Sequence, residues 1–154
     1  DERIINEEFI LNIKPFDAAK ILLSRDNFGC GSSREHAVWA LRDFGIKAVI
    51  ASSFGDIFYN NCFKNGVLPI ILDKDEVETL FKKTKEDILE ISIDLQKKQI
   101  NLSEKVIHFE VDDHLINRII FDLDDVDITL KEKNKILKFE KERIKNKPWI
   151  YTND

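Results

Sequence analysis

The chain has 154 residues, of which 43% are hydrophobic and 34% are charged, and its formal net charge at pH 7 is -5. This length fits a single domain that buries its own core, and the composition is that of an ordinary soluble globular protein. The negative charge argues against a general nucleic-acid-binding surface, and the lack of an apolar run of ~20 residues and of a signal-peptide pattern predicts a cytoplasmic chain without membrane contact.

The first half of the sequence alternates short apolar runs with helical patterns. Residues 1–19 have a mixed composition that predicts irregular or short helical structure. The apolar residues 20–24 predict a short buried strand, and 47–51 predict a second one. A third strand is predicted over 67–72, where Pro69 indicates a sheet edge or a strand end.

Two helices are predicted between these strands. Ser32 and Glu35 have the spacing of a capping box, so the first helix should begin near Ser32 or Ser33, and Gly45 should end it as a C-cap. Ser53 is expected to cap the second helix, which should run to about Asn65. This alternation of strands and helices favours parallel strand pairing with the helices as crossovers.

The second half of the sequence has more charge and a different order of patterns. We expect a charged amphipathic helix at residues 75–85, a half-buried strand with alternating polarity at 89–95 and a polar turn at 96–99. A partner strand should return at 106–111, and two further helices should follow at 115–123 and 136–144. The sequence therefore predicts an α/β fold with a mixed sheet, in which parallel β-α-β units precede an antiparallel hairpin and C-terminal helices.

The turn between the first strand and the first helix concentrates residues suited to binding an anion. Gly29 and Gly31 allow positive φ and a close approach of the backbone to a bound group. A helix start carries unpaired N–H groups and partial positive charge, and Arg34 adds a planar fork of donors. Turning and capping alone would explain the glycines and Ser32, but the addition of Arg34 and His36 favours a site for a carboxylate or phosphate.

This turn does not fit the other common phosphate or nucleophile motifs. It lacks the Gly-Lys-Ser/Thr of a P-loop, and Arg34 stands where the third glycine of Gly-x-Gly-x-x-Gly would be. Glu35 stands where the last glycine of the hydrolase motif Gly-x-Ser-x-Gly would be.

The sequence around this turn carries a resemblance to a known family. Residues 26–37 read DNFGCGSSREHA, which resembles the signature of the swivel domain in the aconitase superfamily. Residues 51–61 and 66–70 resemble the bacterial small-subunit family of 3-isopropylmalate dehydratase, and 123–130 are similar to the tail of that family. The resemblance implies an aconitase-like swivelling β/β/α domain over residues 1–154 that lacks an N-terminal segment usual in the family.

The resemblance also implies a hydro-lyase reaction. Family members isomerise 2-isopropylmalate and 3-isopropylmalate by dehydration and rehydration in leucine biosynthesis. Ser32 matches the serine that removes the carbon-bound proton, and Ser33 and Arg34 match residues that bind the substrate carboxylate. The residues expected to shape the site are Gly29, Gly31 and His36.

The number of cysteines limits which cofactor this chain can hold. By the resemblance, an aconitase-type [4Fe–4S] cluster uses three cysteines, whereas the sequence has two, Cys30 and Cys62. His108 and His114 follow no convincing metal-ligand spacing. We therefore expect no metal on this chain, a cluster on a large-subunit partner, and activity on a small dicarboxylate only when both subunits are present.

Other functions remain open from sequence alone. A related small subunit would act on citramalate, dimethylmalate or homoaconitate with the same mechanism. A non-catalytic anion-binding module would use the turn without any reaction. A serine hydrolase ranks last, because His36 on the following helical turn is a poor partner for Ser32.

Overall fold

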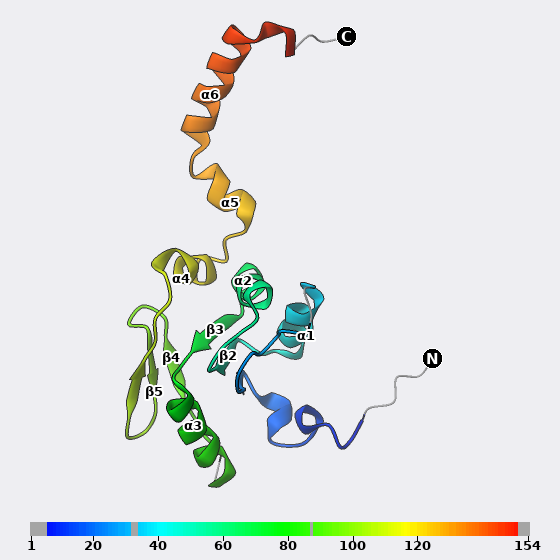
Figure 1. The fold of residues 1–154 in the computed structure, drawn as a ribbon, viewed down its shortest axis with the longest axis vertical. Helices are drawn as coiled ribbons and strands as arrows, with labels where there is room; N and C mark the ends of the chain where they lie inside the picture. The colour runs from blue at the N-terminus through cyan, green and yellow to red at the C-terminus, as the bar shows by residue number, and fades with distance from the viewer. Residues whose placement is uncertain (1–5, 32–33, 87, 151–154) are drawn as a thin grey trace. The chain divides into compact units, whose positions relative to one another are not determined.

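The computed structural model describes residues 6–31, 34–86 and 88–150, and Figure 1 shows its fold. By its internal contacts the chain divides into two compact units, Asp1–Asp122 and Leu123–Asp154. Within the described ranges, no helix is long and apolar enough to cross a membrane. The single swivel domain expected for the whole chain stays a prediction.

A parallel sheet lies at the centre of the first unit. Its three strands have the order β1-β2-β3, and helices α1 and α2 connect them in turn. The elements are β1 (Ile21–Leu23), α1 (His36–Phe44), β2 (Ala48–Ala51), α2 (Asp56–Lys64) and β3 (Leu68–Ile71). The predicted parallel β-α-β units are confirmed, as is the edge position of Pro69. The strand β1 is half-buried rather than buried.

The rest of the first unit adds helices and a second sheet. Two short 3-10 helices, Ile10–Asn12 and Phe16–Ala18, precede β1, as the mixed N-terminal composition predicted. After β3 come α3 (Lys74–Glu86), β4 (Ser92–Asp94), β5 (Gln99–Asn101), β6 (Val106–His108) and α4 (Asp113–Ile120). The strands β4, β5 and β6 form an antiparallel sheet. The parallel and antiparallel strands therefore lie in two separate sheets and not in the one mixed sheet that we expected.

The prediction for the hairpin named the wrong partner strand. We expected residues 106–111 to pair with the first antiparallel strand, but β5 pairs with it and β6 is the third strand. The turn closes early because Asp94 Oδ1 accepts a hydrogen bond from the N–H of Lys97 at 2.9 Å, and Lys98 adopts a left-handed φ of 52°.

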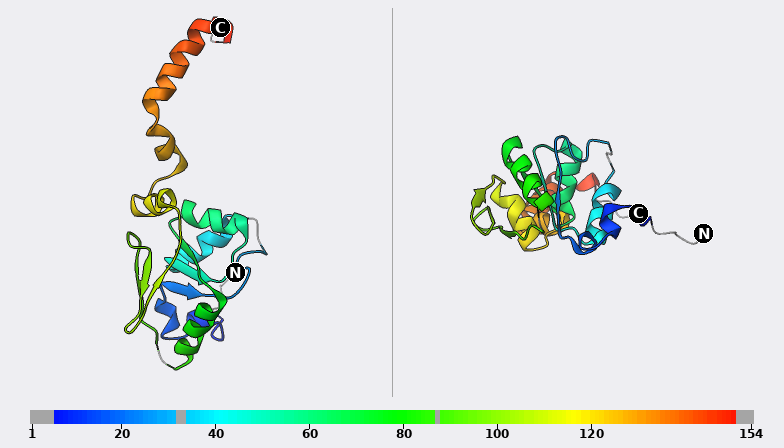
Figure 2. Two further views of the ribbon diagram at one scale, coloured as in Figure 1. Left: turned by 60° about the vertical axis from the view of Figure 1, so that its left-hand side comes forward. Right: turned by 90° about the horizontal axis from the view of Figure 1, so that it is seen from below.

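The hydrophobic core covers both faces of the parallel sheet. On one face, Val49 of β2 packs in a cluster with Val38 of α1 and Phe58 of α2. On the other face, Ile50 belongs to a cluster that includes residues of α3, α4 and the antiparallel sheet, such as Leu80, Ile116, Ile100 and Ile107. The first unit thus has a layer of helices, a parallel sheet and a second sheet, which agrees with the β/β/α expectation (Figure 1, Figure 2).

The second unit consists of helices. It contains α5 (Asp125–Leu130), α6 (Lys133–Asn146) and a 3-10 helix at Pro148–Ile150, which confirms the C-terminal helices. A capping box begins α5, because Asp124 Oδ1 accepts from the N–H of Asp127 at 2.7 Å and Asp127 Oδ2 accepts from the N–H of Asp124 at 3.2 Å.

Candidate functional site

The candidate site is the turn of residues 26–34 between β1 and α1, called the site turn below. It follows the carboxyl end of β1, as predicted. Open α/β sheets tend to bind ligands at this edge. Of the predicted site residues, Gly29, Gly31, Arg34 and His36 are described, whereas 32 and 33 lie outside the described residues.

The helix after the site turn begins later than the capping-box spacing predicted. The first helical residue is His36, and Glu35 is the N-cap. The Glu35 carboxylate accepts a hydrogen bond from Nδ2 of Asn65 at 2.7 Å, and the other member of the predicted box, Ser32, lies outside the described residues. The predicted C-cap is confirmed, because Gly45 has a φ of 108° and its N–H donates to the carbonyl of Leu41.

Close packing fixes the first part of the site turn. Gly29 has a φ of 78°, and a Cβ built on it would lie 2.2 Å from Cγ of Phe58. A Cβ on Gly55 would lie 3.0 Å from the Cα of Cys30. By contrast, Gly31 is exposed, a Cβ there would meet no atom within 4 Å, and it is not among the described glycines with positive φ. The turn is therefore tightly packed at Gly29 and open at Gly31.

The loop after β2 holds the start of the site turn through backbone hydrogen bonds. Ser53 accepts from the N–H of Asn27 through its Oγ at 2.7 Å and from the N–H of Phe28 through its carbonyl at 3.0 Å. In return, the N–H of Gly55 donates to the carbonyl of Phe28 at 2.9 Å. The prediction that Ser53 caps α2 was wrong, because Gly55 is the N-cap and the Ser53 hydroxyl supports the site turn instead.

Asp26 connects the site turn to two other segments. Its Oδ1 accepts a hydrogen bond from Oγ of Ser52, and its Oδ2 pairs with Nζ of Lys74 at the start of α3. The pairing with Lys74, and then the bond from Ser52, hold the pKa of Asp26 below its usual value. Sequence reasoning did not identify this cluster, because the three residues are far apart in the chain and form no motif.

A second network, formed by side-chain hydrogen bonds, supports the start of α1. Asn65, at the end of α2, donates to Glu35 and accepts a hydrogen bond at Oδ1 from Nε1 of Trp39 at 2.8 Å. The ring of His36 lies against Trp39, with 4.5 Å between the ring centroids. Both Arg34 and His36 are exposed. The arrangement thus presents a guanidinium and an imidazole on the surface beside the open part of the site turn.

The thiols of this chain do not fit an iron–sulfur cluster. The sequence supplies two cysteines, whereas an aconitase-type cluster uses three. Cys30 is exposed in the site turn, and Cys62 is buried in the core. Burial raises the pKa of the Cys62 thiol to about 12, which keeps it protonated near neutral pH.

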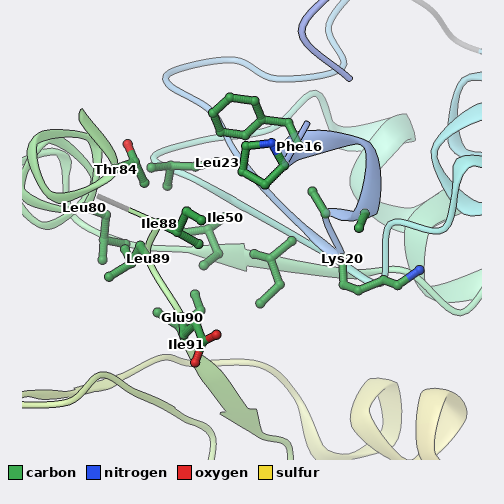
Figure 3. Close-up of a pocket in the computed structure, with 14 residues that line it drawn as sticks. Phe16, Lys20, Leu23, Ile50, Leu80, Thr84, Ile88, Leu89, Glu90 and Ile91 are labelled. Carbon is green, nitrogen blue, oxygen red and sulfur yellow. The ribbon is translucent and has the colours of Figure 1, made fainter. Parts of the chain in front are cut away.

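A separate apolar cavity of about 600 Å³ lies beside β1. Leu23, Leu80 and Ile91 line it together with Phe16, and Lys20 and Glu90 provide charged groups in its lining (Figure 3). No residue of the site turn belongs to its lining. The cavity and the site turn are therefore different features of the first unit.

Known proteins resemble this chain over most of its length. Residues 2–75 match the family of aconitase C-terminal domains. The 3-isopropylmalate dehydratase small subunits of Leptospira interrogans and Pelagibacter ubique are 47% and 49% identical, each over 149 residues that cover 96% of this chain and 72% of the relative. The crystal structure of a 3-isopropylmalate dehydratase from Methanocaldococcus jannaschii is similar with a TM-score of 0.56 and 37% identity, over 79% of this chain and 68% of that one.

Proposed function

Because the chain belongs to the family of 3-isopropylmalate dehydratase small subunits, we propose that it isomerises 2-isopropylmalate and 3-isopropylmalate as one subunit of such an enzyme. The reaction serves leucine biosynthesis, in the cytoplasm. A hydroxyl and a proton leave adjacent carbons as water, and water returns with the two positions exchanged. The observation that carries the proposal is the site turn, which presents Arg34 on an open surface at the carboxyl end of β1.

The substrate of this reaction is a dicarboxylate, which suits the charge of the site turn. Arg34 can hold a carboxylate through two parallel hydrogen bonds, with Ser33 adding a hydroxyl donor. Gly31 leaves the approach open, since a Cβ there would meet nothing within 4 Å. We assign Ser33 and Arg34 to substrate binding, and Gly29, Gly31 and His36 to the shape of the site.

The proton is removed by Ser32 in this proposal. A serine hydroxyl is normally far too weak an acid to act as an alkoxide base, so its anion needs nearby positive charge. In this proposal the Arg34 guanidinium, two residues further along the chain, supplies that charge. Ser32 and Ser33 lie outside the described residues, and their roles come from their positions in the family motif.

The remaining half of the site belongs to a partner in this proposal. The two cysteines of this chain do not fit a [4Fe–4S] cluster. We propose a large subunit that holds the cluster and supplies the Lewis acid for the departing hydroxyl.

A substrate panel tests the proposed reaction. The chain is reconstituted anaerobically with its large subunit, and the unsaturated intermediate is followed by its ultraviolet absorbance. We expect the highest kcat/KM with 2-isopropylmalate among 2-isopropylmalate, citramalate, dimethylmalate and homoaconitate. A higher kcat/KM with one of the other acids would move the chain to a related hydro-lyase, and no turnover of any of them would leave a non-catalytic anion-binding module.

A further inference from the structure

One carboxylate joins the carboxyl ends of all three parallel strands. Asp26 follows β1, Ser52 follows β2, and Lys74 follows β3. Oδ1 of Asp26 accepts from the Ser52 hydroxyl, and Oδ2 pairs with the Lys74 ammonium. Both oxygens of the carboxylate are therefore engaged, each by a different connecting segment.

The next two residues continue this attachment along the site turn. The N–H groups of Asn27 and Phe28 both donate to Ser53, which directly follows Ser52. Asn27 adopts a left-handed φ of 59°, so the chain changes direction immediately after Asp26. The packed start of the turn thus runs from Asp26 to Gly29, and the open part begins where these contacts end.

From this geometry we propose that Asp26 is a positioning residue that, through Ser52 and Lys74, fixes the start of the site turn, from which the chain continues to the assigned base Ser32 and to Arg34. The catalytic consequence rests on the proposed function. Asp26 itself does not touch the substrate in this proposal.

The exposure of the cluster limits its contribution to the stability of the whole fold. The Asp26 side chain is 50% exposed and that of Lys74 is 74% exposed. Ion pairs at such exposed positions contribute little to the free energy of unfolding, because water screens the charges and two flexible side chains lose freedom. A variant that lacks the carboxylate should therefore fold normally while the direction of the turn changes.

The same helix offers a matched control. Glu76 of α3 pairs with Lys105 at 3.1 Å, with 30% of the Glu76 side chain exposed, and neither residue contacts the site turn in the described contacts. Glu76→Gln removes an ion pair of the same kind from the same helix. It should leave the kinetics of the reconstituted enzyme unchanged.

The first test measures kinetics in the complex with the large subunit. We expect Asp26→Ala to lower kcat/KM by about 100-fold, since misplacing a reacting group by ~1 Å can cost this much. Most of the loss should fall in kcat, because proton transfer to Ser32 depends more steeply on distance than the attraction between Arg34 and a carboxylate. Asp26→Asn should recover part of kcat, since its amide oxygen still accepts from Ser52. An Asp26→Ala enzyme with the kcat of the wild type would overturn the proposal.

The second test does not depend on the reaction. Amide hydrogen exchange of the full chain reports on the N–H groups of Asn27 and Phe28, which should exchange at least several-fold faster in Asp26→Ala and not in Glu76→Gln. Unchanged exchange in this peptide would contradict the proposed attachment, and faster exchange with unchanged kcat would contradict its catalytic consequence. If the wild-type complex did not turn over 2-isopropylmalate, the proposed function would fail, while the exchange result would still decide whether Asp26 fixes the turn.

Discussion

At the scale of single residues, the two glycines of the site turn have different roles. Gly29 is needed for its backbone conformation and for the space that Phe58 occupies, because its φ is 78° and a Cβ would overlap the Phe58 ring. Gly31 meets neither condition, since it lies in open space.

The substitution Gly29→Ala tests this difference. We expect it to lower the free energy of unfolding by about 2–4 kcal/mol, from overpacking against Phe58 and from the unfavourable positive φ. Gly31→Ala is the matched control and should change stability by less than about 0.5 kcal/mol. Urea denaturation of both variants measures the difference, and equal stabilities would contradict the packing of the turn.

The assigned roles of Ser32 and Arg34 predict different kinetic defects in the reconstituted enzyme. Ser32→Ala should abolish turnover while substrate binding is retained, because the carboxylate contacts remain. Arg34→Lys should weaken substrate binding markedly, since an ammonium cannot form the two parallel hydrogen bonds of a guanidinium. Equilibrium binding and single-turnover kinetics separate the two effects. Retained turnover in Ser32→Ala would exclude the base assignment.

At the scale of elements, the features that were predicted correctly are those that depend on residues close together in the sequence. The parallel strands, the glycine that ends α1 and the amphipathic helix α3 follow from apolar periodicity and glycine conformation, and they were predicted near their observed positions. The predicted starts of α1 and α2 were wrong for a shared reason. Glu35 and Ser53 have good capping chemistry, but Glu35 accepts a hydrogen bond from Asn65 and Ser53 accepts one from the site turn. Such long-range partners leave no spacing in the sequence.

Asn65 is the clearest example of a long-range contact that holds two elements together. It bonds Glu35 and Trp39 at the start of α1 while its own position is at the end of α2. Asn65→Ala should therefore lower the free energy of unfolding by about 1–3 kcal/mol, because partly buried hydrogen-bonding groups lose their partners.

Asn60→Ala serves as the control for this substitution. Asn60 lies in α2, and among the described contacts its exposed side chain bonds only the carbonyl of Asp56. Asn60→Ala should lower the free energy of unfolding by less than about 0.5 kcal/mol. Thermal unfolding followed by circular dichroism compares the two variants, and an equal loss in both would show that the link between α1 and α2 adds no stability.

At the scale of the whole molecule, the two units differ in how they are stabilised. Both clusters of buried hydrophobic residues consist of residues from the first unit. The helices α5 and α6 have no buried residues, and Leu130, Phe139 and Trp149 are exposed. The first unit therefore contains the core on which cooperative folding depends.

This distribution predicts the result of a truncation. A chain that ends at Asp122 keeps both buried clusters, so it should retain a cooperative unfolding transition. Its melting temperature should lie within about 4 °C of that of the full chain, which corresponds to roughly 1 kcal/mol. Differential scanning calorimetry of both chains measures this. A broad transition without cooperativity would show that residues 123–154 are needed for the core.

The central claim is that this chain supplies one half of an active site. The most direct test is anaerobic turnover of 2-isopropylmalate by this chain alone, by the cluster-bearing large subunit alone and by the two together, followed through the ultraviolet absorbance of the unsaturated intermediate. The account predicts turnover only in the mixture, with a rate that saturates as this chain is added. Turnover by either protein alone, or no turnover by the mixture, would contradict it.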